Sequence, residues 1–366
     1  MFGTSINETL IRQIIDAMSS SGLHSTGFQY VNLDDGWQRY SGARGNRSLE
    51  PDPEKFPSGI KALADYAHEK GFKMGIYTGP GEVTCAGYTA SGGHEVEDAE
   101  MFASWGIDHL KYDSCCEYSN SPTKVVQEVV LKMSEALLAT KRPIVYHACH
   151  CGWNDIWQWA ASEGANQWRI GQDISDDYNY PGNRQGYYFD VLDMLDRGKD
   201  LARYAGPGHW NDYDMLVVGL DGMSTQLVGT GQSNVEYRAH YSMWAMVCSP
   251  LLIGADVRNL DQDSLETLLN KEIADINQDP LGKQAVVIHD GTLQVYTKQM
   301  VDGSYAVALL NRQGETRNIS VSPEDFKWTK ARVRDLWKHT EEGAFADNYE
   351  VEVIPHEAKI LRLWEA

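Results

Sequence analysis

The feature that most constrains the fold is a regular alternation of helical patterns with short β-prone runs, from the start of the chain to about residue 275. A strand followed by a helix, repeated along a chain of this length, is typical of a parallel (β/α)₈ barrel, the TIM barrel. The candidate strands end at Asp35, Tyr77, Asp113, Ala148, Asp173, Asp212 and Ile253.

The helical patterns number eight, one more than the strand patterns. The first has Ser5 and Glu8 at the spacing of a capping box and stops at Gly22. Because the chain opens directly on this helix, we expect the first barrel strand to be missing and Met1 to be an internal methionine taken as a start. The segments "YVNLDD" and "PLLIGAD" are then expected to face each other across a gap.

The periodicity changes near residue 286. From there the apolar residues alternate with period two, and turns such as Asp290-Gly291 and Asp302-Gly303 separate the runs. This pattern predicts an antiparallel β-sandwich. We therefore expect a catalytic barrel over residues 1–285 and a C-terminal β-sandwich over residues 286–366.

Composition excludes several classes of protein. The chain has 366 residues, of which 42% are hydrophobic, so it is too apolar to be disordered. A net charge of −20 argues against nucleic acid or an anionic membrane surface as a partner. No apolar run reaches the ~18 residues of a membrane span.

Location and assembly stay open. No secretory signal precedes the first helix, so we expect a cytoplasmic protein, or a secreted or periplasmic one if an upstream signal was lost. The oligomeric state is not determined, and a homodimer is one possibility.

Polar residues gather where the candidate strands end, which is where barrel enzymes carry their active sites. Carboxylates, one lysine and one arginine at such a mouth favour glycoside hydrolysis, in which two carboxyl groups act as nucleophile and general acid. Lys111 is expected to hold its neighbour Asp113 ionised. The layer comprises Asp34, Asp35, Tyr77, Lys111, Asp113, Cys149, His150, Arg169, Asp173, Asn211, Asp212 and Asp214.

Two other readings of this layer remain. Carboxylate clusters in barrels also bind divalent metals, and "HACHC" places His147, Cys149 and Cys151 on one face of a strand. No second cluster completes a coordination shell, so we predict no metal. A non-catalytic sugar-binding protein would keep the aromatic residues but would not need both Asp113 and Asp173.

Seven motifs, in order, cover almost the whole chain: "YVNLDDGW", "MGIYTGPGEVTCAGY", "GIDHLKYDSC", "WRIGQDI", "GHWNDYDML", "SPLLIGAD" and "INQDPLGKQ". In these motifs the chain resembles glycoside hydrolase family 27, the α-galactosidases and α-N-acetylgalactosaminidases. The resemblance implies a retaining mechanism through a covalent glycosyl-enzyme, α-galactosides as substrates, and no metal or other cofactor.

The resemblance also implies roles for single residues. Asp113 matches the nucleophile, and Asp173 matches the acid/base. Asp34 and Asp35 match carboxylates that hold O4 and O6 of galactose. The other predicted substrate-binding residues are Tyr77, Lys111, Cys149, His150, Arg169, Asp212 and Met215. Cys85 is expected to pair with Cys115, which leaves Cys116 without an assigned partner.

Three departures from the family pattern stand out. "DDCW" is here "DDGW", which removes one common disulfide, and "CEWG" is here "CHCG". His150 therefore stands where galactosidases place a glutamate toward the sugar 2-hydroxyl, and Cys151 replaces a tryptophan. The segment that reads like "PPMGWNSWN" in relatives is missing.

We predict an α-galactosidase, and these departures leave two alternatives. The first is a family member for another glycone: a β-L-arabinopyranoside, an α-GalNAc or an isomaltose-type α-glucoside. The second is a catalytically impaired sugar-binding protein.

Overall fold

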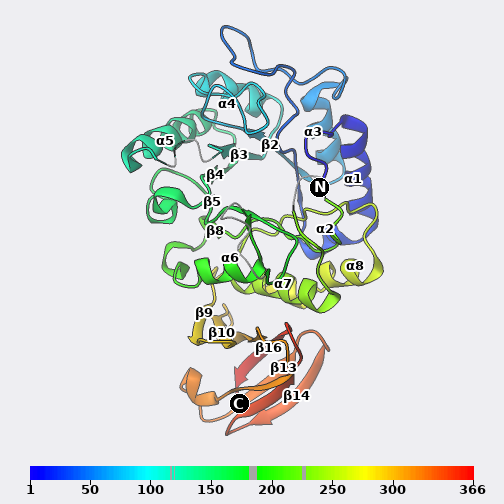
Figure 1. Ribbon diagram of the computed structural model, residues 1–366, viewed down its shortest axis with the longest axis vertical. Helices are drawn as coiled ribbons and strands as arrows, with labels where there is room; N and C mark the ends of the chain where they lie inside the picture. The colour runs from blue at the N-terminus through cyan, green and yellow to red at the C-terminus, as the bar shows by residue number, and fades with distance from the viewer. Residues whose placement is uncertain (116–117, 119, 181–187, 225–227) are drawn as a thin grey trace. The chain divides into compact units, whose positions relative to one another are not determined.

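The structure is a computed structural model that describes residues 1–115, 118, 120–180, 188–224 and 228–366. The chain forms two compact units (Figure 1). The first consists mainly of residues 1–173 with 256–259, and the second mainly of residues 174–223, 228–255 and 260–366. Among the described residues, no helix has the length and apolar character to cross a membrane.

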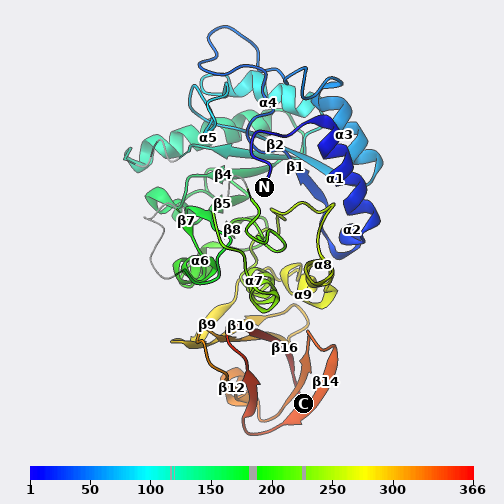
Figure 2. The ribbon, with the colours of Figure 1, turned by 45° about the vertical axis from the view of Figure 1, so that its right-hand side comes forward.

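Helices and parallel strands alternate through the first unit, as predicted. The strands β1, β2, β3, β4 and β5 pair in parallel in that order. The elements are α1 (Glu8–Ser20), α2 (Leu23–Thr26), β1 (Tyr30–Asn32), α3 (Gly59–Glu69), β2 (Lys73–Thr78), α4 (Glu95–Ser104), β3 (His109–Asp113), α5 (Thr123–Ala139), β4 (Val145–Cys149), the 3₁₀ helix η1 (Trp153–Gln158), β5 (Gln167–Arg169) and the short β6, which starts at Asp173. Figures 1 and 2 show α3, α4 and α5 along the outer side of these strands.

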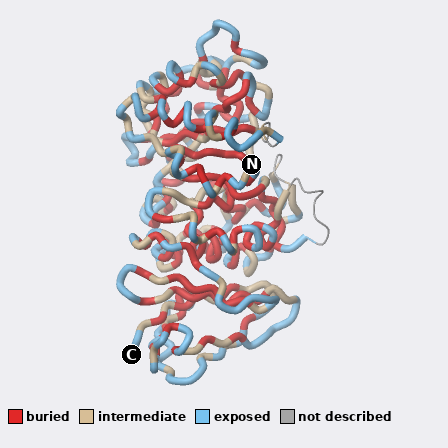
Figure 3. Tube along the Cα trace, turned by 90° about the vertical axis from the view of Figure 1, so that its left-hand side faces the viewer, coloured by how far each residue is buried: buried red, intermediate tan, exposed pale blue. Residues whose placement is uncertain are grey.

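Strands β2 and β3 are buried along nearly their whole length (Figure 3). Strands in parallel sheets are covered on both faces, which explains why their sequences read as continuous apolar runs. Polar side chains are placed on such strands only where they have partners. The lysine of "HLKYD" therefore stands out as a functional position.

The N-terminal cap of α1 differs from the predicted one. Asn7, rather than Ser5, caps the helix, and its side chain accepts a hydrogen bond from the Leu10 N–H (2.9 Å). Glu8 instead accepts hydrogen bonds from Arg12 (2.9 Å) and from the Ser58 N–H (3.0 Å) at the start of α3. The capping-box prediction was wrong because Glu8 serves a contact with a segment distant in sequence.

The "DDGW" departure has a structural reason. Gly36 has a φ of +95°, and a Cβ atom there would lie 2.8 Å from the Cβ of Thr4. The Lys55 ammonium holds the two segments together by donating to the carbonyl oxygens of Thr4 (3.0 Å) and Gly36 (2.8 Å). A cysteine at position 36 would require both a left-handed backbone and displacement of Thr4.

We expect Gly36→Ala to lower the free energy of unfolding by roughly 2–4 kcal/mol, from the left-handed conformation and the clash together. Gly42→Ala is the matched control: its φ is also positive, +77°, but nothing lies within 4 Å of the added methyl group. Urea unfolding of both variants measures the difference. Equal losses for the two variants would show that contact with Thr4 plays no part.

The second unit begins with the rest of the α/β pattern. Its elements are β7 (Tyr188–Phe189), α6 (Val191–Gly198), η2 (Ala202–Tyr204), β8 (Trp210–Asp212), α7 (Asn234–Met246), α8 (Gln262–Leu268) and α9 (Lys271–Asn277). The predicted strand "PLLIGAD" is reduced to a single parallel bridge between Ile253 and Leu216. The predicted helix over 265–274 is interrupted at Asn270, whose side chain caps α9.

Residues 286–366 form antiparallel sheets, as predicted. The larger sheet has the order β14-β13-β16-β11-β10-β9, and β12 pairs with β15. The bounds are β9 (Val286–His289), β10 (Leu293–Gln299), β11 (Tyr305–Asn311), β12 (Arg317–Val321), η3 (Pro323–Phe326), β13 (Ala331–Asp335), β14 (Thr340–Phe345), β15 (Tyr349–Val353) and β16 (Ala358–Glu365). Val307, Leu309, Val333 and Leu361 belong to the core between the sheets.

These sheets pack on α7 within the second unit (Figure 2). Arg334 donates to both carboxylate oxygens of Glu272, each at 2.8 Å, and the Trp337 indole N–H donates to Ser242 (3.0 Å). The contacts of the chain thus group the sandwich with the second half of the α/β part. The domain boundary between residues 285 and 286 stays a prediction. So does the expectation that "YVNLDD" and "PLLIGAD" face each other across a gap.

Candidate active site

Lys111, on β3, lies between two of the predicted site carboxylates. Its Nζ atom is 2.8 Å from Asp34 Oδ2 and 3.8 Å from Asp113 Oδ2. Burial by itself lowers the pKa of Lys111, but the charges of Asp34 and Asp113 raise it well above the ordinary value. The lysine is therefore charged, and its main partner is Asp34 rather than the sequence neighbour Asp113.

Asp113 closes β3 and is 8% exposed. Its Oδ1 atom accepts a hydrogen bond from the Cys115 N–H (2.9 Å), and its Oδ2 atom faces the Lys111 ammonium. One oxygen is thus held by a backbone donor and the other lies near a positive charge. This environment holds the carboxylate in one orientation.

The Cys85–Cys115 disulfide is present, as predicted, and joins the loop after β2 to the turn after β3. The Tyr77 hydroxyl donates to Cys85 Sγ (3.0 Å), and the Lys111 ammonium lies 5.2 Å from the centre of the Tyr77 ring. Cys151 is also disulfide-bonded, and Cys116 lies outside the described residues. These contacts bring the end of β2 to the predicted nucleophile.

Asp34 and Asp35, after β1, have different environments. The Asp34 side chain is 64% exposed. Loss of water around the carboxyl group raises its pKa, but the charge and hydrogen bond of Lys111 lower it by more. The pKa of Asp34 therefore lies below the ordinary value. Asp35 is buried, and its pKa is raised, mainly by burial. Its Oδ2 atom accepts from the Ala86 N–H (2.7 Å), whereas its buried Oδ1 atom has no hydrogen-bond partner of good geometry among the described residues. The Ala86 N–H and the Thr84 side chain partly offset the effect of burial on the pKa of this carboxyl.

Cys149 and His150 stand at the end of β4, both buried. Burial raises the pKa of the Cys149 thiol well above its ordinary value, so the sulfur is a neutral thiol rather than a nucleophile. Both ring nitrogens of His150 have protein partners: Nδ1 is 2.6 Å from Ser114 Oγ, and Nε2 is 2.9 Å from Asn154 Oδ1.

Arg169 and Asp173 come from the end of β5 and the residues beyond it. Arg169 is buried, and its Nη2 atom donates to the Gln172 carbonyl (2.6 Å) and to Asp173 Oδ1 (3.2 Å). The Asp173 side chain is 60% exposed, in contrast to 10% for Asp113. The first unit thus provides one shielded and one open carboxylate.

Asp212 and Met215 belong to the second unit. Asp212 is buried at the end of β8, and its Oδ1 atom accepts from the Asp214 N–H (2.8 Å). Met215 is half-buried and follows Asp214, whose φ is +71°. Their predicted contact with substrate stays a prediction.

Three residues that the sequence did not single out support this site. The buried Trp37 indole N–H donates to the Tyr77 carbonyl (2.7 Å), and Ser114 and Asn154 bind His150. Ser114 carried a signal in its place directly after Asp113, and Trp37 carried one as the last residue of "YVNLDDGW". The contacts of Trp37 and Asn154 depend on segments that are distant in sequence.

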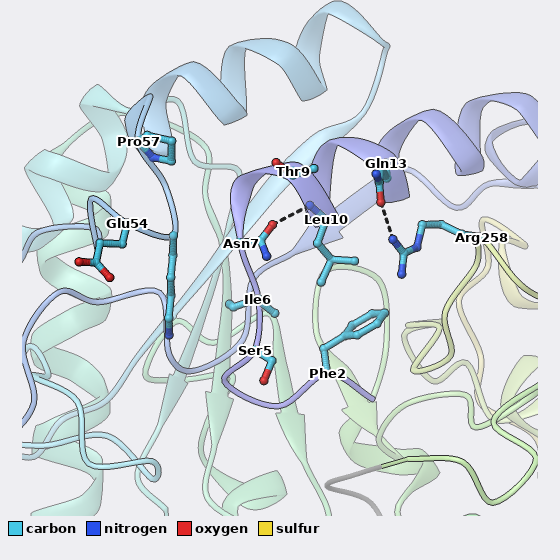
Figure 4. Close-up of a pocket in the computed structure, with 11 residues that line it drawn as sticks. Phe2, Ser5, Ile6, Asn7, Thr9, Leu10, Gln13, Glu54, Pro57 and Arg258 are labelled. Atoms are coloured by element: carbon cyan, nitrogen blue, oxygen red, sulfur yellow. Dashed lines mark hydrogen bonds between the residues drawn. The ribbon is translucent and has the colours of Figure 1, made fainter.

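An open pocket of about 680 Å³ in the first unit contains none of the predicted site residues (Figure 4). It lies at the start of α1 and is lined by Phe2, Ser5, Ile6, Asn7, Thr9, Leu10, Gln13, Glu54, Lys55, Pro57 and Arg258. The Gln13 side chain accepts a hydrogen bond from Arg258 across it. The acidic cluster at the strand ends is therefore a separate feature.

Family models match nearly the whole chain. Residues 3–279 match the model described as "Alpha galactosidase A", and residues 290–363 match "Alpha galactosidase C-terminal beta sandwich domain". An α-galactosidase of Cyamopsis tetragonoloba is 40% identical over 98% of this chain and 82% of its own length. α-Galactosidase A of Cellvibrio japonicus is 38% identical over 99% of this chain and 89% of its own length.

Solved structures agree. The crystal structure of α-galactosidase I from Mortierella vinacea has a TM-score of 0.93 at 33% identity, covering 100% of this chain and 95% of that one. A crystal structure from Bacteroides fragilis, described as a putative α-galactosidase, also has a TM-score of 0.93, at 38% identity over 100% of this chain and 77% of that one. The predicted fold class, an α/β barrel followed by an antiparallel β-sandwich, is confirmed.

Proposed function

Because this chain belongs to the α-galactosidases of glycoside hydrolase family 27, which are retaining hydrolases, we propose that Asp113 is its nucleophile and Asp173 its acid/base. The contrast between the two carboxylates supports this assignment best. Asp113 is shielded and oriented by the Cys115 N–H and the Lys111 ammonium. Asp173 is open to solvent, where it can exchange protons with a leaving group and with water.

The reaction then runs in two displacements. A carboxylate oxygen of Asp113 attacks the anomeric carbon while Asp173 protonates the departing glycosidic oxygen, so the C–O bond to the aglycone breaks and an ester to Asp113 forms. Asp173, now ionised, takes a proton from a water molecule that attacks the same carbon. The ester breaks, and the sugar leaves with its original anomeric configuration.

The carboxylates after β1 are placed to bind sugar hydroxyls. The Oδ1 atom of buried Asp35 has no hydrogen-bond partner of good geometry among the described residues, so a sugar hydroxyl is a suitable donor to it. Asp34, ionised beside Lys111, is a second strong acceptor. The lysine also brings a positive charge to the hydroxyls that Asp34 binds. This pairing supports recognition of a hydroxyl-rich, uncharged glycone such as galactose.

The glycone can be identified with p-nitrophenyl glycosides. We expect kcat/KM to be highest for the α-galactoside. Asp34 and Asp35, proposed for O4 and O6, disfavour the α-glucoside, whose O4 is equatorial, and the β-L-arabinopyranoside, which lacks O6. The α-GalNAc keeps both hydroxyls and differs from galactose only at C2, so its rate tests recognition at that position alone. A higher value for any of the other three would identify that alternative. Absence of turnover on all four, with galactose still bound in calorimetry, would favour an impaired sugar-binding protein.

The natural substrates we propose are terminal α-galactosides of oligosaccharides or glycoconjugates. Disulfides persist in oxidising compartments. Cys85 and Cys115 form a disulfide, and Cys151 is disulfide-bonded as well. We therefore favour a secreted or periplasmic location over the cytoplasm. The homodimer stays a prediction, which sedimentation would test.

A further inference from the structure

A hydrogen-bonded chain runs from the residue after Asp113 to the loop after β4. Ser114 Oγ is 2.6 Å from His150 Nδ1, and His150 Nε2 is 2.9 Å from Asn154 Oδ1. The Asn154 Nδ2 atom donates in turn to the Ser121 carbonyl (3.0 Å) and to Thr123 Oγ1 (3.5 Å). The ends of β3 and β4 are thereby connected through side chains as well as through the sheet.

These contacts determine the tautomer of His150. Because Asn154 uses its amide group as the donor to Ser121, its Oδ1 atom must accept from an Nε2–H of the histidine. In the neutral ring the Nδ1 atom is then an acceptor. The Ser114 hydroxyl donates to it (2.6 Å) rather than to the more distant Cys149 carbonyl (3.3 Å). Burial lowers the pKa of His150, more than the Asn154 contact and the Asp113 charge raise it, so the ring is neutral.

The ring has little freedom to do anything else. His150 is 1% exposed and Ser114 is 6% exposed, and the Ser114 N–H continues the ladder between β3 and β4 by donating to the Cys149 carbonyl (3.0 Å). A sugar hydroxyl could bind a His150 nitrogen only by displacing Ser114 or Asn154. Asn154 has a φ of +55°, which places its amide against the ring at the cost of a left-handed backbone.

We infer that His150 is a positioning residue, which holds Ser114 and thereby orients the adjacent Asp113 for attack, and that it does not bind the sugar 2-hydroxyl. This role rests on the proposed function of Asp113 as nucleophile. Two consecutive residues after Asp113 are then restrained. His150 holds Ser114 through a hydrogen bond. The disulfide with Cys85 holds Cys115, whose N–H donates to Asp113 Oδ1. A misplacement of a reacting group by about 1 Å can cost around a hundredfold in rate.

Four variants test the inference: Ser114→Ala, His150→Leu, the double variant and His150→Asn. We expect kcat for p-nitrophenyl α-galactoside to fall about 10–100-fold in the first three, while KM and the inhibition constant of galactose stay within about twofold. The double variant should lose no more than His150→Leu, because the two side chains act through one contact. His150→Asn should recover most of kcat, since its amide oxygen can accept from Ser114 near the former Nδ1 position.

Two substrates separate positioning from sugar binding. A positioning residue should cause equal losses on galactosides and 2-deoxy-galactosides, whereas a ligand of the 2-hydroxyl should cost more on galactosides. Melting temperatures and galactose binding show that each variant is folded. The inference is overturned if Ser114→Ala leaves kcat unchanged, if galactose affinity falls in step with kcat, or if the Ser114 and His150 effects add.

Failure of the proposed function would look different. If the unmodified protein hydrolyses none of the glycosides, the nucleophile assignment and the positioning role fall together. If it hydrolyses the α-galactoside and Ser114→Ala is fully active, only the positioning role is wrong.

Discussion

Replacing Asp113 with alanine is expected to lower kcat on α-galactosides by at least about a thousandfold, because the covalent step loses its nucleophile. The remaining cavity should admit a small anion. Added azide should then restore part of the rate by attacking from the vacated side, and the product should be the β-galactosyl azide, of inverted configuration. Proton NMR of the anomeric signal identifies that product.

Asp155→Ala is the matched control for this experiment. Asp155 is an exposed aspartate in η1. Its side chain accepts a hydrogen bond from Gln158 (3.3 Å), and its replacement should leave turnover unchanged. Substantial turnover by the Asp113 variant without azide would contradict the nucleophile assignment. Retention of galactose binding by that variant would confirm that only the chemical step is lost.

Replacing Asp173 with alanine is expected to have an effect that depends on the leaving group. An aglycone such as p-nitrophenol departs with little protonation, whereas a sugar hydroxyl needs a general acid. We therefore expect a loss of about 10²–10⁴-fold on melibiose, which has a sugar aglycone, and a smaller loss of the glycosylation step on the nitrophenyl substrate. Steady-state kcat/KM on a series of phenyl galactosides measures this dependence.

The unmodified protein on the same series is the reference. Its rates should vary little with the pKa of the leaving phenol, whereas the variant's rates should rise steeply as that pKa falls. A uniform loss on every aglycone would remove Asp173 from the acid/base role. Arg169 would then be the first residue to test, because its guanidinium forms an ion pair with Asp173 and its loss would disturb the position of that carboxylate.

Strand direction made much of the site predictable. Residues at the ends of neighbouring parallel strands meet at one edge of a sheet, so Tyr77, Lys111 and Cys149 could be grouped from sequence alone. The register confirms this for all three, since Tyr77 pairs with Lys111, and Cys149 pairs with Asp113 on the same strand as Lys111. Such predictions need only periodicity and the positions of the turns.

The wrong predictions concern residues whose structure depends on contacts with segments distant in sequence. Glu8 looked like part of a helix cap and instead binds the Ser58 N–H. "PLLIGAD" has the composition of a strand but forms only one bridge, at Ile253. Local propensity cannot reveal such contacts because the partner is absent from the local window.

The sequence by itself determined the fold class, because periodicity and turn positions show it. The resemblance of its ordered motifs to family 27 identified the family and implied the two candidate catalytic carboxylates and the Cys85–Cys115 pairing. Only the tertiary structure decided that Lys111 lies closer to Asp34 than to Asp113 and that Gly36 has no room for a side chain. It alone also showed both nitrogens of His150 already bonded. Hydrogen bonds and clashes depend on distances of a few tenths of an ångström between segments far apart in the chain, and motif spacing carries no information about those distances.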